Sequence, residues 1–203
     1  SIGETVERIG RWARALAAGA WVSGAGWYND AWTDRAFPTR RQLDRAAGGR
    51  PVFLRRKDGH SAWVSSAALR LAGIDGRTPD PPGGRIDRDG SGEPSGILRE
   101  TAMELVAAVV PSAEAQELDA AMARSLADLA RLGLTAVHSM DSARGFASLQ
   151  RLHARGRLPI RVTYNLPLAG LPHAERLGVR SGWGDSMLRI WGVKAFLDGS
   201  LGS

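Results

Sequence analysis

Lys194 is the first candidate for a chemically reactive residue, because of its type and its position in the sequence. It lies in the apolar segment 188–199, where strict alternation places it on one face with Leu188 and Ile190. A lysine inside an apolar strand must be paired or lose its charge, because a buried unpaired ammonium is costly. The neutral amine can act as a nucleophile, form a Schiff base, or add carbon dioxide and become a metal-binding carbamate. The alternative is a structural ion pair between Lys194 and Asp198 at the end of the strand.

The proportion of lysine to arginine indicates a special role for Lys194, whereas the distribution of the arginines gives little support to a nucleic-acid partner. Only Lys57 and Lys194 are lysines among 27 basic residues, so a lysine at a strand end indicates chemistry that arginine cannot perform. The net charge is +6, but the arginines are scattered singly or in pairs along the chain. A nucleic-acid-binding module usually concentrates its basic residues on one face, and this composition therefore makes it the weaker alternative.

Two histidine-containing segments offer further polar groups. His138 ends the apolar segment 134–138, and parallel α/β enzymes place active-site groups at such ends. Asp58 and His60 flank a glycine, so the turn can present a carboxylate and an imidazole to a cleft. In each case a structural role, as a hydrogen-bonded strand end or an aspartate-stabilised turn, is the alternative. His153, on a helix, and His173, in a loop, are expected at the surface.

Several classes of protein are excluded by composition. The chain has no cysteine, which rules out disulfides, cysteine–zinc sites, iron–sulfur clusters and a thiol nucleophile. No segment is apolar for long enough to cross a membrane. The Ser–His–Asp order, the glycine-rich nucleotide loop and the His-Glu-x-x-His pattern are also missing.

The elements that must position these residues follow from periodicity and turn signals. An amphipathic helix is predicted over 4–18, and residues 20–100 read as a compact subdomain of short strands and turns. The remainder alternates regularly between helices and strands, with Ser112 as the N-cap of the first helix and a buried strand over 134–138. The expected order is a helix to residue 132 and then segments 134–138, 143–154, 159–166 and 188–199. This order predicts a parallel sheet, in either a doubly wound fold or a (β/α)8 barrel.

Blocks of residues along nearly the whole chain resemble one family, the YtcJ-like metal-dependent amidohydrolases (amidohydrolase family 3). The blocks occur in the family's order and are specific as a set, although each is weak alone. They are residues 26–27, 37–44, 50–52, 58–69, 72–74, 80–84, 92–98, 133–138 and 192–203.

The resemblance implies an α/β fold, namely a partial (β/α)8 TIM barrel that contains about strands 2–4 and an inserted small α+β subdomain. Residues 1–19 would be the barrel helix after a missing first strand, and residues 20–105 the inserted subdomain. Residues 106–203 would be the βα units that end at the fourth strand. The chain is therefore expected to be an internal fragment of a longer protein.

The resemblance also implies a metal centre at the carboxyl ends of the barrel strands. Lys194 matches the family's carbamylated lysine, which bridges two divalent metal ions, with zinc as the expected metal. The family's other ligands are a His-x-His pair, two further histidines and an aspartate, and they would lie outside this chain. His60, His138, Asp58 and Asp198 are candidates to line the substrate pocket. The family's usual aspartate after the second strand is Ser139 here.

The implied reaction is hydrolysis of carbon–nitrogen bonds other than peptide bonds, in linear amides, by a metal-activated hydroxide. The fragment itself is expected to be inactive, to bind no metal, to carry an unmodified Lys194 and to self-associate. We expect a cytoplasmic protein with a small amide substrate and without a membrane or nucleic-acid partner. A non-catalytic relative that keeps the fold is the other alternative.

Overall fold

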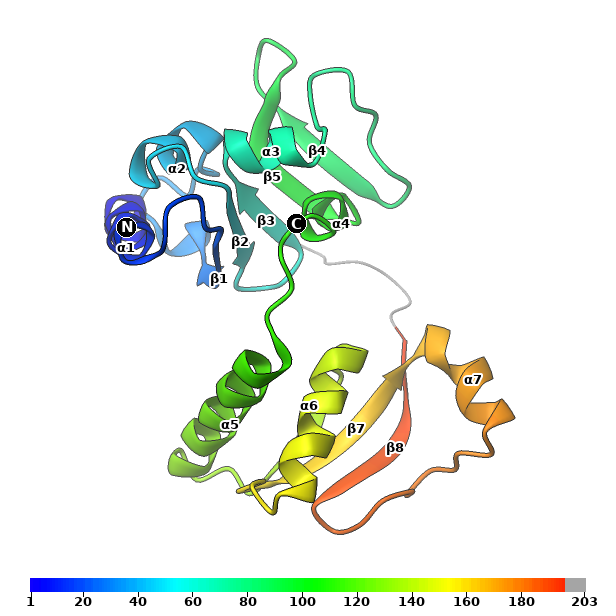
Figure 1. The fold of residues 1–203 in the computed structure, drawn as a ribbon. Helices are drawn as coiled ribbons and strands as arrows, with labels where there is room; N and C mark the ends of the chain where they lie inside the picture. Colours follow the sequence, from blue (N-terminus) through cyan, green and yellow to red (C-terminus); the bar gives the residue numbers. More distant parts are fainter. Residues whose placement is uncertain (196–203) are drawn as a thin grey trace. The chain divides into compact units, whose positions relative to one another are not determined.

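The computed structural model describes residues 1–195, and the chain forms two compact units (Figure 1). Of the described residues, one unit covers 1–111 and the other covers 112–195. Asp198, one of the candidate pocket residues, lies outside the described residues. Within the described part of the chain, no helix combines the length and the apolar character that crossing a membrane requires.

The first unit is built on a five-stranded sheet with the order β1-β2-β3-β5-β4. The pair β1 and β2 is parallel, whereas the other neighbouring strands are antiparallel. These strands are β1 (Val22–Trp27), β2 (Val52–Arg56), β3 (Ser61–Val64), β4 (Gly84–Arg88) and β5 (Pro94–Glu100). Short strands are thus present within residues 20–100, as the sequence predicts.

Helices cover both faces of this sheet. Side chains of α1 and α2 join a core on one face, together with Trp27 and Trp63 from the strands. Side chains of α3 and α4 join a second core on the other face, around Phe53 and Leu98. The helices are α1 (Ile2–Ala15), η1 (Asn29–Ala31, a 3-10 turn), α2 (Arg40–Ala46), α3 (Ser66–Leu71) and α4 (Ala102–Ala107).

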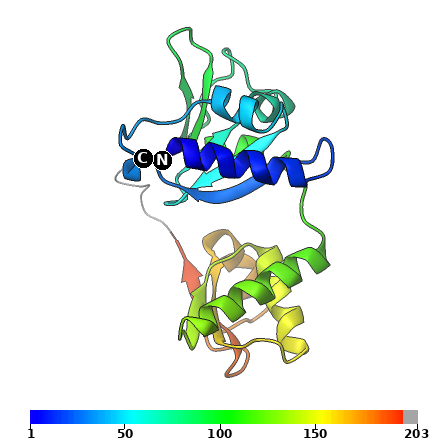
Figure 2. The ribbon, with the colours of Figure 1, turned by 90° about the vertical axis from the view of Figure 1, so that its left-hand side faces the viewer.

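The first helix shares a core with the strand that follows it. Ile9 and Ala13 on α1 are buried with Val22 and Trp27 of β1, and Figure 2 shows α1 lying across this unit. The first unit extends to Pro111, and the division of the chain into an inserted subdomain and barrel units at residue 105 stays a prediction. The assignment of residues 1–19 to a barrel stays a prediction, but in the described structure their helix packs within the first unit.

The second unit confirms the predicted alternation of helices and parallel strands. Its sheet has the order β6-β7-β8, and both neighbouring pairs are parallel. The elements are α5 (Ala115–Arg131), β6 (Ala136–Ser139), α6 (Ala143–Ala154), β7 (Arg161–Pro167), η2 (Leu168–Gly170), α7 (Leu171–Arg176) and β8 (Leu188–Lys194). This is a mixed α/β arrangement in which each strand follows a helix.

One face of the second sheet carries the core of this unit. Leu126 of α5 and Leu149 of α6 pack against Val162 of β7 and Ile190 of β8. Figure 1 shows α5 and α6 on the same side of these strands. We call the opposite side of this sheet, where Thr163 and Asn165 of β7 point, the open face. The alternation along β7 separates the two faces.

Three local predictions were wrong. Helix α5 is capped by Glu114 instead of Ser112, because the Glu117 carboxylate accepts a hydrogen bond from the Glu114 N–H at 3.1 Å. Strand β6 is largely exposed, because it pairs only with β7 among the described strands and its Ala136 and His138 point away from the helices. His173 lies in α7, not in a loop.

Candidate functional site

A bulge near the end of β8 decides where Lys194 points. The register pairs Tyr164 with Ile190 and then Asn165 with Gly192, so that Trp191 is an extra residue in β8. Such an insertion shifts every later side chain to the other face relative to strict alternation. A β-carbon added to Gly192 would lie 3.6 Å from Asn165 Oδ1, which agrees with both residues pointing to the open face.

Lys194 therefore lies on the open face. It is paired in register with Pro167, which is two residues beyond Asn165 and shares its face. Leu188 and Ile190, which precede the bulge, point instead into the core with the helices. The expectation that Lys194 shares a face with these two residues was wrong, because period-two alternation holds only while the register is unbroken.

His138 also lies on the open face, near the carboxyl end of β6, which pairs with β7. Its register partner is Thr163 of β7, which points to the open face. The residue is exposed, as expected for an edge strand, and it is the second-last residue of β6. The carboxyl ends of parallel strands meet at one edge of a sheet. His138 and Lys194 thus share both the face and the edge at which α/β enzymes place reactive groups.

The turn after His138 is fixed by hydrogen bonds. Ser139 Oγ donates to Asp141 Oδ2 at 2.6 Å, and Tyr164 Oη donates to the Asp141 carbonyl oxygen at 2.7 Å. The Tyr164 ring stacks on Phe146, with 4.1 Å between centroids. Burial, together with the nearby Asp141 charge, raises the pKa of Tyr164, so this phenol stays a hydrogen-bond donor. Asp141 is thereby held by Ser139 of β6 and Tyr164 of β7.

In the first unit, the turn between β2 and β3 carries Asp58 and His60. One oxygen of Asp58 is ion-paired with Arg56, and the other accepts a hydrogen bond from the His60 N–H at 3.0 Å. Both oxygens of Asp58 therefore stabilise the turn, the structural alternative that the sequence had left open. Of the two candidate residues, His60 is the one whose side chain is left for other contacts.

The imidazole of His60 pairs with Glu100 at the end of β5. His60 Nδ1 lies 2.9 Å from Oε1 and 3.1 Å from Oε2 of this carboxylate. Each of the two side chains is 32% exposed, so the pair is reachable from solvent. Sequence reasoning missed Glu100, because forty residues separate it from His60 and only the antiparallel pairing of β3 with β5 brings them together.

Arg56 is the buried anchor of this turn. Its side chain is 4% exposed and also donates to Asn29 Oδ1 at 2.9 Å and to Asp30 Oδ2 at 2.6 Å. The guanidinium lies 4.9 Å from the centroid of the Tyr28 ring, a cation–π arrangement. Arg56 lies between two other basic residues in the sequence, Arg55 and Lys57, and it is buried because it points to the opposite face of β2 from the exposed Arg55.

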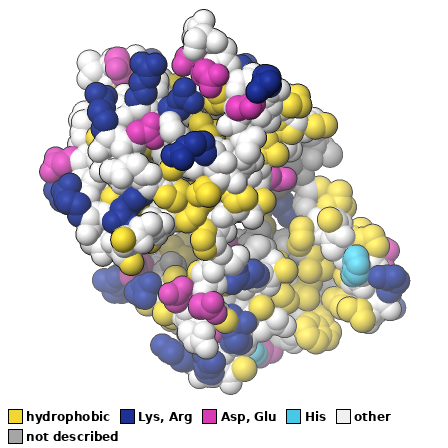
Figure 3. All heavy atoms as spheres, turned by 45° about the horizontal axis from the view of Figure 1, so that its top comes forward, with side chains coloured by type: hydrophobic (Ala, Val, Ile, Leu, Met, Phe, Trp, Pro, Cys, Tyr) yellow, Lys and Arg dark blue, Asp and Glu magenta, His cyan; other side chains and the backbone are white. Residues whose placement is uncertain are grey.

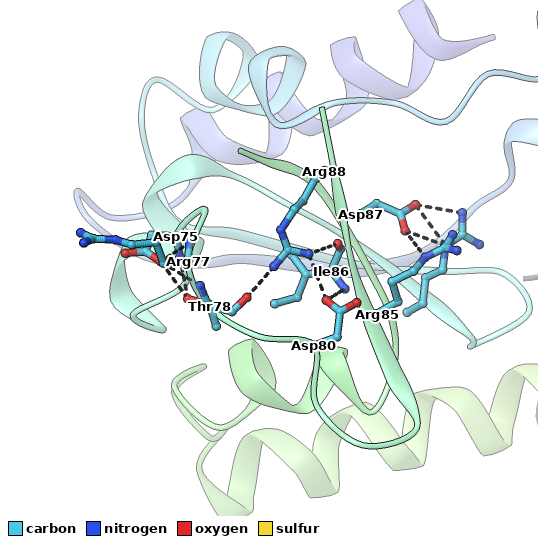
Figure 4. Close-up of polar contacts among 9 residues, drawn as sticks. Asp75, Arg77, Thr78, Asp80, Arg85, Ile86, Asp87 and Arg88 are labelled. Atoms are coloured by element: carbon cyan, nitrogen blue, oxygen red, sulfur yellow. Dashed lines mark hydrogen bonds and ion pairs between the residues drawn. The ribbon is translucent and has the colours of Figure 1, made fainter. Parts of the chain in front are cut away.

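Polar contacts also order the long loop before β4, drawn in Figure 4. Asp80 Oδ1 accepts hydrogen bonds from the Ile86 N–H and from Arg88 Nη1, each at 3.0 Å. Asp75 accepts from the backbone N–H groups of Arg77 and Thr78. These hydrogen bonds lower the pKa of both carboxyl groups, so the aspartates stabilise the loop as anions.

A second missed cluster joins α5 to α6. Asp119 is buried and accepts hydrogen bonds from Ser148 Oγ at 2.7 Å and from Arg151 Nη2 at 2.7 Å. The Arg151 guanidinium, followed by the Ser148 hydroxyl, lowers the pKa of Asp119 from 3.8 to about 2. All three side chains are committed to one another, so the cluster holds two helices together and does not form a reactive site.

The described residues do not assemble a complete metal site. Over residues 1–195, no three His, Cys, Asp or Glu side chains are grouped closely enough to bind a metal ion. Lys194 and His138 belong to the second unit, whereas His60 and Asp58 belong to the first. A metal centre at Lys194 would need donors from outside the described residues.

Comparison with known proteins gives consistent matches. A family model described as "Amidohydrolase family" matches residues 1–203. YtcJ of Bacillus subtilis (strain 168) is 34% identical over 195 residues, covering 93% of this chain and 36% of that protein. N-substituted formamide deformylase of Arthrobacter pascens is 34% identical over 164 residues, covering 78% of this chain and 30% of the enzyme.

A solved structure shows a similar arrangement of elements. The crystal structure of a protein from Pyrococcus horikoshii, described as an uncharacterized metal-dependent hydrolase, matches with a TM-score of 0.66 and 28% identity. The match covers 100% of this chain and 38% of that one. The chain therefore spans about a third of the length of the relatives it matches.

Proposed function

Because this chain belongs to the amidohydrolase family, we propose that it is part of a metal-dependent hydrolase of carbon–nitrogen bonds other than peptide bonds. The proposed substrates are linear amides, and the proposed nucleophile is a hydroxide activated by divalent metal. The name of the Arthrobacter relative, a formamide deformylase, supports this substrate class. We propose further that β6, β7 and β8 are strands 2–4 of a (β/α)8 barrel, with most of the first unit as an insertion.

The placement of Lys194 carries this proposal. The bulge at Trp191 directs Lys194 to the open face, which also bears His138, at the edge where the parallel strands end. Without that bulge, Lys194 would point toward the helices and could not reach a site on the open face. A strand interrupted in this way supports a functional role for the lysine, because bulges often re-aim a side chain next to an active site.

We propose that Lys194, as a carbamate, bridges two divalent metal ions in the longer protein, with zinc as the expected metal. The carbamate changes a cation into an anion with two oxygen donors, which arginine cannot supply. Because residues 1–195 do not provide a full donor set, the 203-residue chain is expected to leave Lys194 unmodified and to be inactive by itself.

The chain's own polar groups have more limited roles in this proposal. His60 and His138 are each proposed as candidates for substrate contact. Asp58 is proposed to hold the turn that carries His60, since both its oxygens are already engaged. The alternative of a nucleic-acid-binding module gains no support from the surface drawn in Figure 3, where basic and acidic side chains are interspersed.

The experiment is an amide-hydrolysis assay on a longer protein that contains this segment and its flanking sequence, using N-substituted formamides with and without a chelator. We expect chelator-sensitive hydrolysis that Lys194→Ala reduces by at least about 100-fold. Lys57→Ala is the matched control, since Lys57 is the other lysine and lies over the Tyr28 ring in the first unit. Equal activity of the Lys194 and Lys57 variants would overturn the assignment.

The carbamate can be checked separately by 13C NMR with labelled bicarbonate. A carbamate signal is expected in the metal-loaded longer protein, and Lys194→Ala should remove it. The 203-residue chain should show no such signal. A Lys194 carbamate in this shorter chain would show that the flanking metal ligands are unnecessary for the modification.

A further inference from the structure

The pairing of His60 with Glu100 is more than a surface ion pair, because the backbone joins it. The Glu100 N–H donates to the His60 carbonyl oxygen at 3.1 Å, while the carboxylate receives the imidazole at 2.9 and 3.1 Å. Two points of contact thus fix Glu100 relative to His60. A freely moving surface pair would have only the side-chain contact.

Glu100 has an unfavourable backbone conformation. Its φ is +49°, in the left-handed region, which it shares with one other non-glycine among residues 1–195, Arg35. Glycine tolerates this region freely, and asparagine and aspartate enter it with help from their short side chains, but glutamate has neither advantage. Strained residues of this kind tend to occur where a side chain must be held in one place.

The backbone of His60 is positioned independently. Asp58 accepts the His60 N–H at 3.0 Å and is itself held by the buried Arg56. The main chain of His60 is therefore fixed by the turn, and its ring by Glu100. A carboxylate accepts hydrogen bonds and cannot donate them, so in the neutral imidazole the proton facing Glu100 must be on Nδ1.

We propose that Glu100 is a positioning residue that keeps neutral His60 in the Nδ1–H tautomer, so that Nε2 presents a lone pair to the N–H of an amide substrate. Among residues 1–195, His60 Nε2 has no hydrogen-bond partner, and the side chain is 32% exposed. The choice of an amide N–H as ligand rests on the proposed function, whereas the tautomer rests on the geometry alone.

A second histidine, His153, contacts a carboxylate through the other ring nitrogen and serves as an internal comparison. His153 Nε2 lies 2.8 Å from Asp185 Oδ2, and the other oxygen of Asp185 accepts the Met187 and Leu188 N–H groups. By the same reasoning, neutral His153 carries its proton on Nε2. The structure therefore predicts opposite tautomers for two carboxylate-paired histidines in one molecule.

The test is 15N NMR of the 203-residue chain with labelled histidine, above the ordinary imidazole pKa of about 6.5. The chain has four histidines, and His60→Gln and His153→Gln assign the two signals of interest. We expect a protonated Nδ1 in His60 and a protonated Nε2 in His153. A protonated Nε2 in His60, alone or together with Nδ1, would overturn the proposal.

Glu100→Gly separates positioning from structural support. Glycine relieves the left-handed strain, and this offsets part of the cost of losing the carboxylate, so urea unfolding should still show a cooperative transition of a folded protein. The His60 signals should move toward the Nε2–H form preferred by a solvated imidazole, while those of His153 stay unchanged. Asp185→Asn should leave the His60 signals unchanged, because the carboxylate that contacts His60 is that of Glu100, whereas Asp185 contacts His153. A stable Glu100→Gly protein with an unchanged His60 tautomer would refute the role of Glu100.

The ligand is tested with two small amides that differ in one proton. N-methylacetamide has an N–H and should shift the His60 Nε2 signal on titration, whereas N,N-dimethylacetamide should not. Equal responses, or no response to either, would overturn the assignment of an amide N–H to this nitrogen. Failure of the proposed hydrolase function would appear differently, as a longer protein without amide hydrolysis whose His60 tautomer is still Nδ1–H.

Discussion

Replacing Arg56 with methionine should destabilise the first unit far more than the same change at the neighbouring Arg55. Arg56 is 4% exposed and donates to Asn29, Asp30 and Asp58. Arg55 is exposed on the other side of the same strand. The two substitutions remove the same group from adjacent positions, so their difference isolates the buried hydrogen bonds.

The magnitude follows from how well each former partner can regain water. Asn29 is 1% exposed, and its amide oxygen would lose the Arg56 donor, at a cost of about 1–3 kcal/mol. Asp30 and Asp58 have side chains that are 49% and 25% exposed, so rehydration offsets most of their loss and leaves about 1 kcal/mol. We expect a total near 3 kcal/mol, the lower end for breaking a buried ion pair.

The assay is urea unfolding followed by tryptophan fluorescence, because Trp27 and Trp63 lie in the core of this unit and the centroid of the Trp27 ring is 6.0 Å from the Arg56 guanidinium. Arg55→Met should change the free energy of unfolding by less than about 0.5 kcal/mol. If the two variants differ by less than that amount, Arg56 is not the anchor of the turn. The positioning of His60 by this turn would then have to be abandoned as well.

Two further outcomes concern stability. The hydrogen bonds from Arg151 and Ser148 lower the pKa of Asp119, so the stability that they add should be complete above pH 3.8 and be lost as the pH falls through about 2. Asp119→Asn should remove this contribution from an acid-unfolding curve recorded by circular dichroism. An unchanged curve would contradict the prediction. Gly96→Ala should cost more than about 1 kcal/mol in urea unfolding, because φ is +106° and the new methyl would lie 2.6 Å from the Arg40 backbone nitrogen. Gly90→Ala, with open space around it, is the control, and equal effects would refute the steric argument.

The two histidine candidates illustrate how far local patterns reach. His138 was placed correctly at a strand end, because the apolar run before it and the helix after it are local features. The partner of His60 could not be found in this way, since Glu100 reaches it only through the pairing of β3 with β5. A positive φ at a glutamate leaves no mark in the sequence that would have indicated such a role.

By itself, the sequence determined the alternation of helices and strands in the second half of the chain. Helix α6 has the predicted bounds, residues 143–154, because its apolar spacing and its final glycine are both local signals. The tertiary structure alone decided the direction of Lys194. Alternation is a property of one strand, whereas a bulge exists only in the register between two strands, and the extra residue Trp191 in β8 reverses the faces that alternation predicts.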